Sequence, residues 1–350
     1  MRLSVLDQST VVTGRSPGDA IQETLALARH CEALGYERYW VAEHHSSLSQ
    51  AGTAPEILIA AIAATTRRIR VGSAGVMLPH YAPLKVAEQF RVLEAIAPGR
   101  IDLGLGRAPG GDGRTAFALN PNAAAAAEHF PADVRDLLAW LAGEKLVEGH
   151  PFRDIRAEPA GVTVPEVWIL GSSTYGAQVA AHFGLPYCYA HFITDGQGAA
   201  EAMDMYHTLY QPGARHPLPH AAVAAWALTA ATEAEADHQL ASRALWRLGR
   251  DRGIYTQLPS PTEAPMPTLT PTRNAPGWTG CVKMRFGARR TRSRRNSLAS
   301  HRTFKPARLP SSPRCTTKPP GNAPIRCWRK PHGYGRRLRS RLNDRRARHS

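Results

Sequence analysis

The chain alternates short, almost wholly apolar segments with longer segments of helical periodicity, and this pattern runs from residue 1 to about residue 264. The apolar segments predict strands at 3–7, 38–43, 69–78, 100–106, 166–170, 186–192 and 222–229. The stretches between them predict helices at 17–34, 54–66, 83–97, 131–146, 174–183, 196–210 and 232–250. Apolar strands separated by helices form parallel sheets that are covered on both faces. Seven such units favour an α/β fold of the (β/α)₈ TIM-barrel type that lacks its eighth β-α unit.

The charge of the chain is divided very unevenly. The 350 residues include 44 Lys and Arg and 28 Asp and Glu, a net charge of +16. Residues 265–350 hold 23 of these bases and a single acid, Asp344, so residues 1–264 carry 21 bases and 27 acids. We therefore expect two parts: a mildly acidic barrel over 1–264, and an Arg/Pro-rich tail over 265–350 that is disordered.

Several classes of protein are excluded by composition. No run of 18 apolar residues is present, which argues against a transmembrane helix. The start, MRLSVLDQST, lacks the apolar core of a signal peptide, so a cytoplasmic location is expected. The five cysteines form no C-x-x-C pair, so neither a disulfide framework nor a metal site is expected.

Candidate functional residues follow the predicted strands, because the chemistry of α/β barrels collects at the carboxyl ends of the strands. Adjacent His44 and His45 would leave an extended strand on opposite faces and would not chelate one metal ion together. On the residues alone, ordinary packed or exposed histidines are favoured over catalysis at this pair.

Two glycine-containing turns are candidates for binding phosphate. Gly104-Leu105-Gly106 begins like a dinucleotide-binding fingerprint, but Pro109 stands where its third glycine belongs, so a tight turn presenting Arg107 is favoured. Gly171-Ser172-Ser173 lies between a strand and a helix, where free N–H groups, hydroxyls and a nearby arginine suit a phosphate. Plain N-capping by Ser173, with nothing bound, is the equal alternative.

Longer motifs carry a resemblance to a known family. They are E-H-H at 43–45 after Y-W-V-A, T-x-R-I-R-V-G-S-A-G-V-M-L-P-H-Y at 66–81, P-G-R-I-D-L-G-L-G-R-A-P-G at 98–110, and W-I-L-G-S-S at 168–173. Together they resemble the bacterial luciferase-like flavin-dependent monooxygenases over nearly all of residues 1–264. The forms L-P-H-Y at 78–81 and G-R-A-P at 106–109 are similar to the FMN-using subgroup rather than its deazaflavin-using relatives.

The resemblance implies roles for individual residues. Arg107, Ser172 and Ser173 would hold the FMN phosphate. Ala74 and Gly75 would lie beside the isoalloxazine ring, where the family often has a non-proline cis peptide. His44 takes the position of the family's active-site histidine near the flavin C4a atom, which raises the catalytic interpretation above the packing one, while His45 stays open.

The resemblance also implies a reaction. Reduced FMN and O2 would form a C4a-peroxyflavin that oxygenates a small organic substrate, with the reduced FMN supplied by a separate flavin reductase. The protein would exclude water, with residues 107–130 as a candidate lid. A homodimer is left open, and no membrane partner is expected. The alternative within the same fold is a deazaflavin-dependent oxidoreductase that transfers hydride.

The basic tail has two interpretations. One is a nucleic-acid-binding arm on an idle barrel, although the tail lacks the interleaved aromatic residues of a recognised module. The favoured one is out-of-frame translation, because the resemblance stops at 261–264, where the eighth unit should follow. Read one base earlier, the codons of residues 266–280 allow an acidic amphipathic helix with a capping box. The nucleotide sequence around codon 264 tests this frameshift hypothesis.

Overall fold

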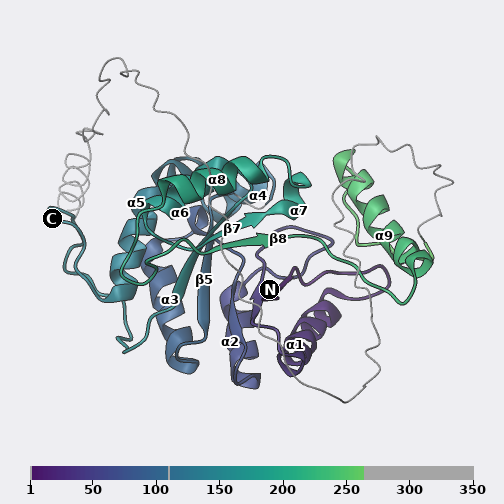
Figure 1. Ribbon diagram of the computed structural model, residues 1–350, viewed down its shortest axis with the longest axis horizontal. Coiled ribbons are helices and arrows are strands. Elements are labelled where there is room, and N and C mark those ends of the chain that lie inside the picture. Colours follow the sequence, from purple (N-terminus) through teal and green to yellow (C-terminus); the bar gives the residue numbers. More distant parts are fainter. Residues whose placement is uncertain (1, 109–110, 264–350) are drawn as a thin grey trace, which may run out of the picture. The chain divides into compact units, whose positions relative to one another are not determined.

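The computed structural model describes residues 2–108 and 111–263, and within them it forms a parallel sheet surrounded by helices (Figure 1). The strands run in the spatial order β1-β2-β3-β5-β6-β7-β8, all parallel, with the short β4 beside β5. Their bounds are Val5–Asp7 (β1), Arg38–Val41 (β2), Arg70–Ser73 (β3), Val76–Met77 (β4), Ile101–Gly106 (β5), Glu166–Gly171 (β6), Tyr187–Ala190 (β7) and Ala221–Ala224 (β8). The sheet is nearly closed into a barrel, as the alternation of apolar and helical segments predicts.

The helices cover the outside of this sheet, and neighbours pack on one another, α2 on α3 and α6 on α8 among them. Their bounds are Pro17–Leu34 (α1), Pro55–Thr65 (α2), Pro83–Ile96 (α3), Gly113–Leu119 (α4), Ala123–Ala142 (α5), Thr174–His182 (α6), His191–Thr194 (α7), Ala199–Leu209 (α8) and Glu233–Asp251 (α9), with a 3₁₀ turn at Leu78–His80 (η1). None of the helices in the described part of the chain is long and apolar enough to cross a membrane.

Local sequence signals explain where the first helix begins and ends. The Ser16 side chain accepts a hydrogen bond from the Asp19 N–H, and the Asp19 carboxylate accepts one from the Ser16 N–H, which makes a capping box before Pro17. Gly35 ends the helix in the left-handed region, at φ 80°. Both ends therefore follow from residues that the sequence analysis could see.

The predicted strand 69–78 is two strands in the structure. β3 ends at Ser73 and β4 begins at Val76, and the Ala74–Gly75 peptide between them is cis. The pairing with β5 slips by one residue across this break, since Val71 pairs with Ile101 whereas Val76 pairs with Leu105. The continuous apolar run concealed this irregularity.

Glycines let the strands approach closely at this break. A Cβ on Gly104 would lie 2.2 Å from the Ser73 carbonyl oxygen and 2.5 Å from Leu170 Cδ1. The Ser73 hydroxyl, in turn, donates a hydrogen bond to the Gly104 carbonyl and accepts one from the Gly104 N–H. Gly104 therefore serves the packing of β3 on β5, which accounts for the fingerprint-like turn without a dinucleotide.

Three other boundaries differ from expectation. The run of alanines at 123–127, within the expected lid, forms the first turns of α5, so that helix begins before the predicted residue 131. β7 stops at Ala190 because residues 191–194 turn into the short helix α7, and β8 covers only Ala221–Ala224. The expected lid, residues 107–130, thus contains α4 and the first turns of α5, and its role as a lid stays a prediction.

The two ends of the sheet are β1 and β8. Among residues 2–108 and 111–263, no ladder joins β8 to β1, so the barrel stays one β-α unit short, as predicted. The predicted tail, residues 265–350, lies outside the described residues, and so do the nucleic-acid and frameshift interpretations that depend on it.

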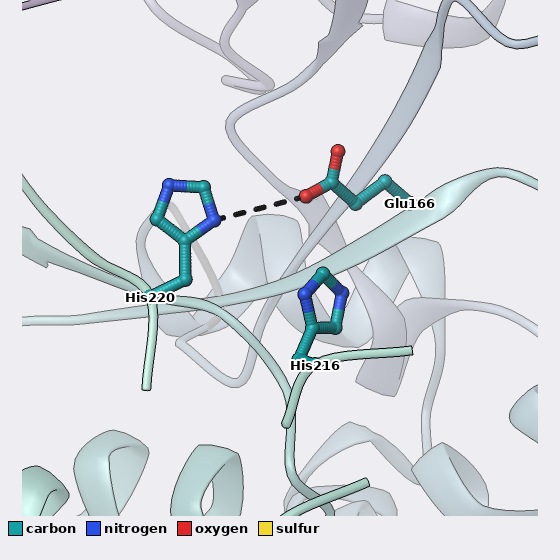
Figure 2. Close-up of side chains that lie close together, drawn as sticks. All are labelled: Glu166, His216 and His220. Carbon is teal, nitrogen blue, oxygen red and sulfur yellow. Dashed lines mark ion pairs between the residues drawn. The ribbon is translucent and has the colours of Figure 1, made fainter. Parts of the chain in front are cut away.

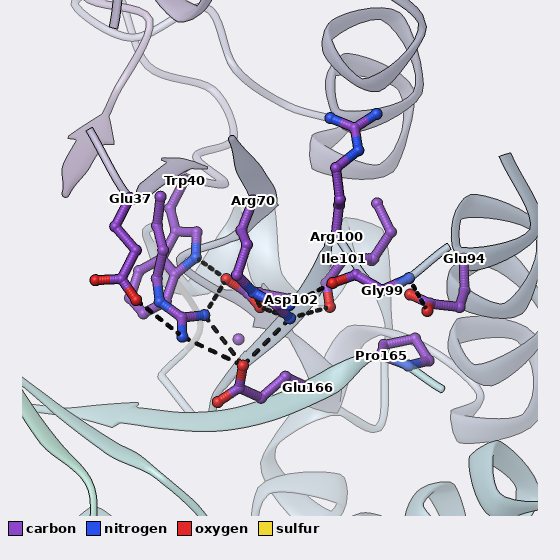
Figure 3. Close-up of polar contacts among 12 residues, drawn as sticks. Glu37, Trp40, Arg70, Glu94, Gly99, Arg100, Ile101, Asp102, Pro165 and Glu166 are labelled. Atoms are coloured by element: carbon purple, nitrogen blue, oxygen red, sulfur yellow. Dashed lines mark hydrogen bonds and ion pairs between the residues drawn. The ribbon is translucent and has the colours of Figure 1, made fainter. Parts of the chain in front are cut away.

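The amino ends of the strands are tied by a buried ion-pair network (Figure 3). The fully buried Asp102 on β5 accepts bonds from Arg38 at 2.6 Å, from Arg70 at 2.5 Å and from the Trp40 indole N–H at 2.8 Å. Both guanidinium groups also lie 3.2 Å from the Glu166 carboxylate on β6. These contacts join four neighbouring strands at the end opposite the candidate site.

Candidate functional site

A cavity of about 530 Å³ opens at the carboxyl ends of the strands. Its volume falls within the range of small-molecule and cofactor sites in proteins. It receives residues from the ends of β1, β2, β5, β6, β7 and β8, from the β3–β4 break and from α9. All six residues singled out in the sequence line it: His44, Ala74, Gly75, Arg107, Ser172 and Ser173.

His44 reaches this cavity just beyond β2. Burial, together with the charges of His45 and Arg250, lowers the pKa of His44 from 6.5 to about 4, so its imidazole is neutral at pH 7. Its Nδ1 atom is buried and has no hydrogen-bond partner among the described residues. A neutral ring with an unused nitrogen at a cavity wall is equipped to bind a polar group of a ligand.

His45 points elsewhere and is held by a buried carboxylate. Its Nε2 lies 2.7 Å from Glu43 Oε1, and the same oxygen accepts a 2.6 Å hydrogen bond from the Tyr81 hydroxyl. The other oxygen of Glu43 accepts a bond from the Met77 N–H at 3.0 Å. Glu43 therefore fixes the chain around His44, and His45 belongs to this support rather than to the cavity lining.

The Ala74–Gly75 link forms part of the cavity wall, and its peptide is cis, as the resemblance implies. A Cβ on Gly75 would lie 2.8 Å from the Gly104 carbonyl oxygen and 3.0 Å from Leu170 Cδ1. A larger residue at 75 would therefore displace the β5 backbone. With only a methyl group at Ala74 and no side chain at Gly75, this part of the wall carries little side-chain bulk.

Arg107 lies beside the serine turn. Its guanidinium carbon is 4.0 Å from the centre of the Tyr175 ring, and Tyr175 stands on the first turn of α6, directly after Ser172 and Ser173. Ser173 is the N-cap residue of α6, but its side chain makes no capping hydrogen bond. The plain N-capping interpretation is therefore wrong, and Ser173 lines the same cavity as Arg107.

Cys188 also lines the cavity, on β7, and it has no nucleophilic character there. Burial raises the pKa of its thiol to about 12, so the group stays protonated at neutral pH. Cys188 contributes apolar surface beside Leu170 and Ala224.

The sequence analysis missed one wall of the cavity. Arg243, Arg247 and Arg250 on α9 all line it. Arg243 lies over the Trp226 ring at 4.7 Å, and Arg250 lies over the Trp246 ring at 5.3 Å. Burial and the charge of Arg247 lower the pKa of Arg250. The available signal was their spacing of four and three residues, which places the three side chains on one helical face.

A second cluster lies at the opposite end of the strands. Glu166, His216 and His220 bring their ligand atoms within 4.8 Å of one another, a combination that the sequence analysis did not expect (Figure 2). One Glu166 oxygen lies 3.9 Å from His220 Nδ1, whereas the other is bonded by Arg38 and Arg70. Two guanidinium groups beside this carboxylate oppose the binding of a cation.

Comparison with known proteins identifies the family. The model of the family described as luciferase-like monooxygenase matches residues 1–280, which extends beyond the predicted boundary at residue 264. The chain belongs to the luciferase-like monooxygenase family. This confirms the resemblance that was inferred from E-H-H, L-P-H-Y and W-I-L-G-S-S. The luciferase-like chain is therefore an oxidoreductase of the class that incorporates oxygen.

Three known proteins resemble this luciferase-like chain over most of its length. The N-acetyl-S-alkylcysteine monooxygenase of Bacillus subtilis is 39% identical over 244 residues, which cover 69% of this chain and 72% of the relative. The apo structure of MsnO8 is 41% identical with a TM-score of 0.69, covering 75% of this chain and 77% of that one. The oxygenating constituent of 3,6-diketocamphane monooxygenase from Pseudomonas putida, solved with FMN, shares the fold at 18% identity and a TM-score of 0.54, over 75% and 81% of the two chains.

Proposed function

We propose that this chain binds reduced FMN in the cavity at the carboxyl ends of its strands and uses O2 to oxygenate a small organic substrate. The observation that carries the proposal is that six residues from four separate segments line one cavity, with Arg107 stacked on Tyr175 in the first turn of α6. When bound, reduced flavin supplies the chemistry that activates O2 for transfer of one oxygen atom.

The residues present fit such a cofactor. Arg107 offers a charge-assisted bond to a phosphate, and Ser172, Ser173 and the first-turn N–H groups of α6 offer further donors. The small residues Ala74 and Gly75 leave room on the cavity wall for a fused ring. In the related fold from Pseudomonas putida the ligand is FMN, which supports the same cofactor here.

His44 is the candidate acid–base residue. Its neutral imidazole can accept a proton from a bound group at Nδ1 or donate one, depending on the tautomer. Glu43, through its bonds to His45, Tyr81 and the Met77 N–H, holds the segment that carries His44. His44 itself stays free for the ligand.

The substrate class is suggested by a relative. The Bacillus subtilis relative acts on N-acetyl-S-alkylcysteines by its name, so we propose a thioether-bearing organic molecule as the first substrate class to test. Reduced FMN would come from a separate flavin reductase.

An anaerobic titration tests the cofactor. The purified 350-residue chain is titrated with reduced FMN and, in parallel, with reduced deazaflavin cofactor F420, and binding is followed by absorbance and calorimetry. We expect saturable binding of FMN with clear preference over the deazaflavin. Preference for the deazaflavin would replace the monooxygenase proposal by hydride transfer on the same fold.

A further inference from the structure

One helical face of α9 brings an excess of positive charge to the cavity. Arg243, Arg247 and Arg250 line it together with Arg107, whereas the only acidic residue on its lining is Glu43. Glu43 is already engaged by His45 and Tyr81. The described wall therefore carries three more positive than negative charges, which is a costly arrangement near apolar surface unless an anion binds there.

Among the described residues, two carboxylates lie close to the α9 arginines. Asp195, at the end of α7, lies 4.0 Å from Arg243 and 3.9 Å from Arg247, so one carboxylate serves two guanidinium groups. Asp251 bonds Arg247 from the far side at 3.1 Å. Within the described residues, no carboxylate lies within 4.0 Å of Arg250.

Aromatic rings hold the arginine stems in place. Trp226, which follows β8, lies under Arg243, and Trp246 on α9 lies under Arg250. Both rings also line the cavity. Stacked guanidinium groups are pre-organised, so little side-chain entropy remains to be lost when an anion binds.

Two groups of basic residues from different segments thus line one cavity. Arg107 and the serine turn form the first, and they suit the phosphate of the proposed cofactor. The α9 arginines form the second, which comes from a different segment and from the wall that includes Trp226 and Trp246.

We propose that Arg243, Arg247 and Arg250 bind a carboxylate of the organic substrate and thereby set its orientation in the cavity. A carboxylate matches the planar fork of a guanidinium in a bidentate arrangement, and a neutral amide of the same shape does not replace its charge. The substrate class is thus an organic acid with an apolar portion, which packs against the tryptophan rings. The inference that the bound acid is the substrate rests on the proposed function, but binding of the acid itself is tested without flavin.

The experiment compares the binding of a carboxylic acid with that of its neutral amide. The full chain, without flavin, is titrated calorimetrically with N-acetyl-S-methylcysteine and with the corresponding primary amide. We expect the acid to bind at least about 10-fold more tightly than the amide, and raising the salt concentration should narrow this difference. Equal affinities for the two compounds would overturn the proposal, and so would failure of both to bind.

Variants on α9 locate the effect. Arg250→Gln should reduce the affinity for the acid about 10-fold while leaving that for the amide unchanged, and Arg250→Lys should restore part of the loss. Arg252→Gln, on the exposed C-cap of the same helix and outside the cavity lining, is the matched control and should change neither affinity. Unchanged acid binding in Arg250→Gln would overturn the proposal.

Flavin binding separates the two proposals. The same variants are titrated with reduced FMN and with reduced riboflavin, which lacks the phosphate. We expect Arg250→Gln to bind both like the parent. A loss for FMN alone would mean that α9 holds the cofactor phosphate, and would overturn the substrate proposal while leaving the flavin proposal intact. A parent chain that binds the acid but no flavin would overturn only the proposed function.

Discussion

The guanidinium carbon of Arg107 lies 4.0 Å from the centre of the Tyr175 ring, which joins the end of β5 to the first turn of α6. This contact brings Arg107 next to the helix that follows the turn of Ser172 and Ser173, more than sixty residues later in the sequence. A phosphate at this turn would meet a fixed charge rather than a mobile one.

Replacing Arg107 should reveal the phosphate site. Arg107→Ala is expected to weaken the binding of FMN by about 1.5–3 kcal/mol, because a charge-assisted bond is lost. Riboflavin, which lacks the phosphate, should bind the variant and the parent equally. Calorimetric titration of both ligands measures the difference, and equal losses for the two flavins would refute this assignment of Arg107.

Replacing His44 should affect turnover more than cofactor binding. His44→Ala is expected to retain the affinity for FMN and to lose about 10²–10⁴ in turnover, the usual contribution of an acid–base group. The measurement is the ratio of oxygenated product to hydrogen peroxide, together with the rate of O2 consumption. A variant with the parent's rate and product ratio would show that His44 is only structural.

His44 should also contribute to acid sensitivity. Its pKa is about 4 in the folded chain, against 6.5 when exposed, so the unfolded chain binds a proton at a higher pH than the folded chain does. The free energy of unfolding should therefore fall as the pH drops from 6.5 towards 4. His44→Gln cannot titrate and should lose less stability over this range than the parent. Urea midpoints at pH 7 and pH 4.5 measure the effect, and parallel losses would contradict it.

The close contact between β3 and β5 leads to a prediction about the stability of the fold. Gly104→Ala would place a methyl group 2.2 Å from the Ser73 carbonyl oxygen, so we expect a loss of about 1–3 kcal/mol or more. At Gly106, on the same strand, the nearest atom to a new Cβ is 3.9 Å away. Gly106→Ala is therefore the matched control and should stay within about 1 kcal/mol of the parent. Similar urea midpoints for the two variants would show that the backbone around Gly104 shifts to accommodate the methyl group.

The buried network at the other end of the strands should be equally sensitive. Asp102→Asn removes the charge that compensates Arg38 and Arg70, and we expect a loss of about 3–5 kcal/mol. Glu88→Gln, which affects an exposed ion pair with Lys85, should cost less than about 1 kcal/mol. The two variants are compared by urea denaturation at pH 7. A loss at Asp102 no larger than at Glu88 would show that water compensates the arginines.

The alternation of apolar strands and helices was sufficient to predict the barrel, which the described residues leave open between β8 and β1. Strand burial is a local property of residues such as Val71, Ile101 and Val167, so hydrophobic periodicity reports it. Hydrophobic periodicity does not show the break at Ala74–Gly75, because apolar residues continue on both sides of it, and only the family resemblance indicated an unusual peptide there. It arises from the approach of two backbones, which no single segment encodes.

The candidate site was predicted where motifs mark it and missed where it depends on tertiary placement. His44, Arg107 and the serine turn lie in motifs that follow strands, and they meet on one cavity. The α9 arginines lie on a polar helix whose charges, by sequence, suit exposure to solvent. Their position depends on Asp195, nearly fifty residues earlier, which no local pattern connects to them.

Asp195 has a consequence for how the cavity responds to its surroundings. Of the residues in α9, only Ser242 is buried, and ion pairs of about 4 Å link Arg243 and Arg247 to the loop after β7. Apolar packing is insensitive to salt, whereas ion pairs that keep some exposure to solvent are weakened by it, although less than fully exposed pairs are. The position of this wall, and with it the exclusion of water from the reaction, therefore depends on the ionic medium, so that activity measured in dilute buffer and in concentrated salt should differ even at saturating cofactor.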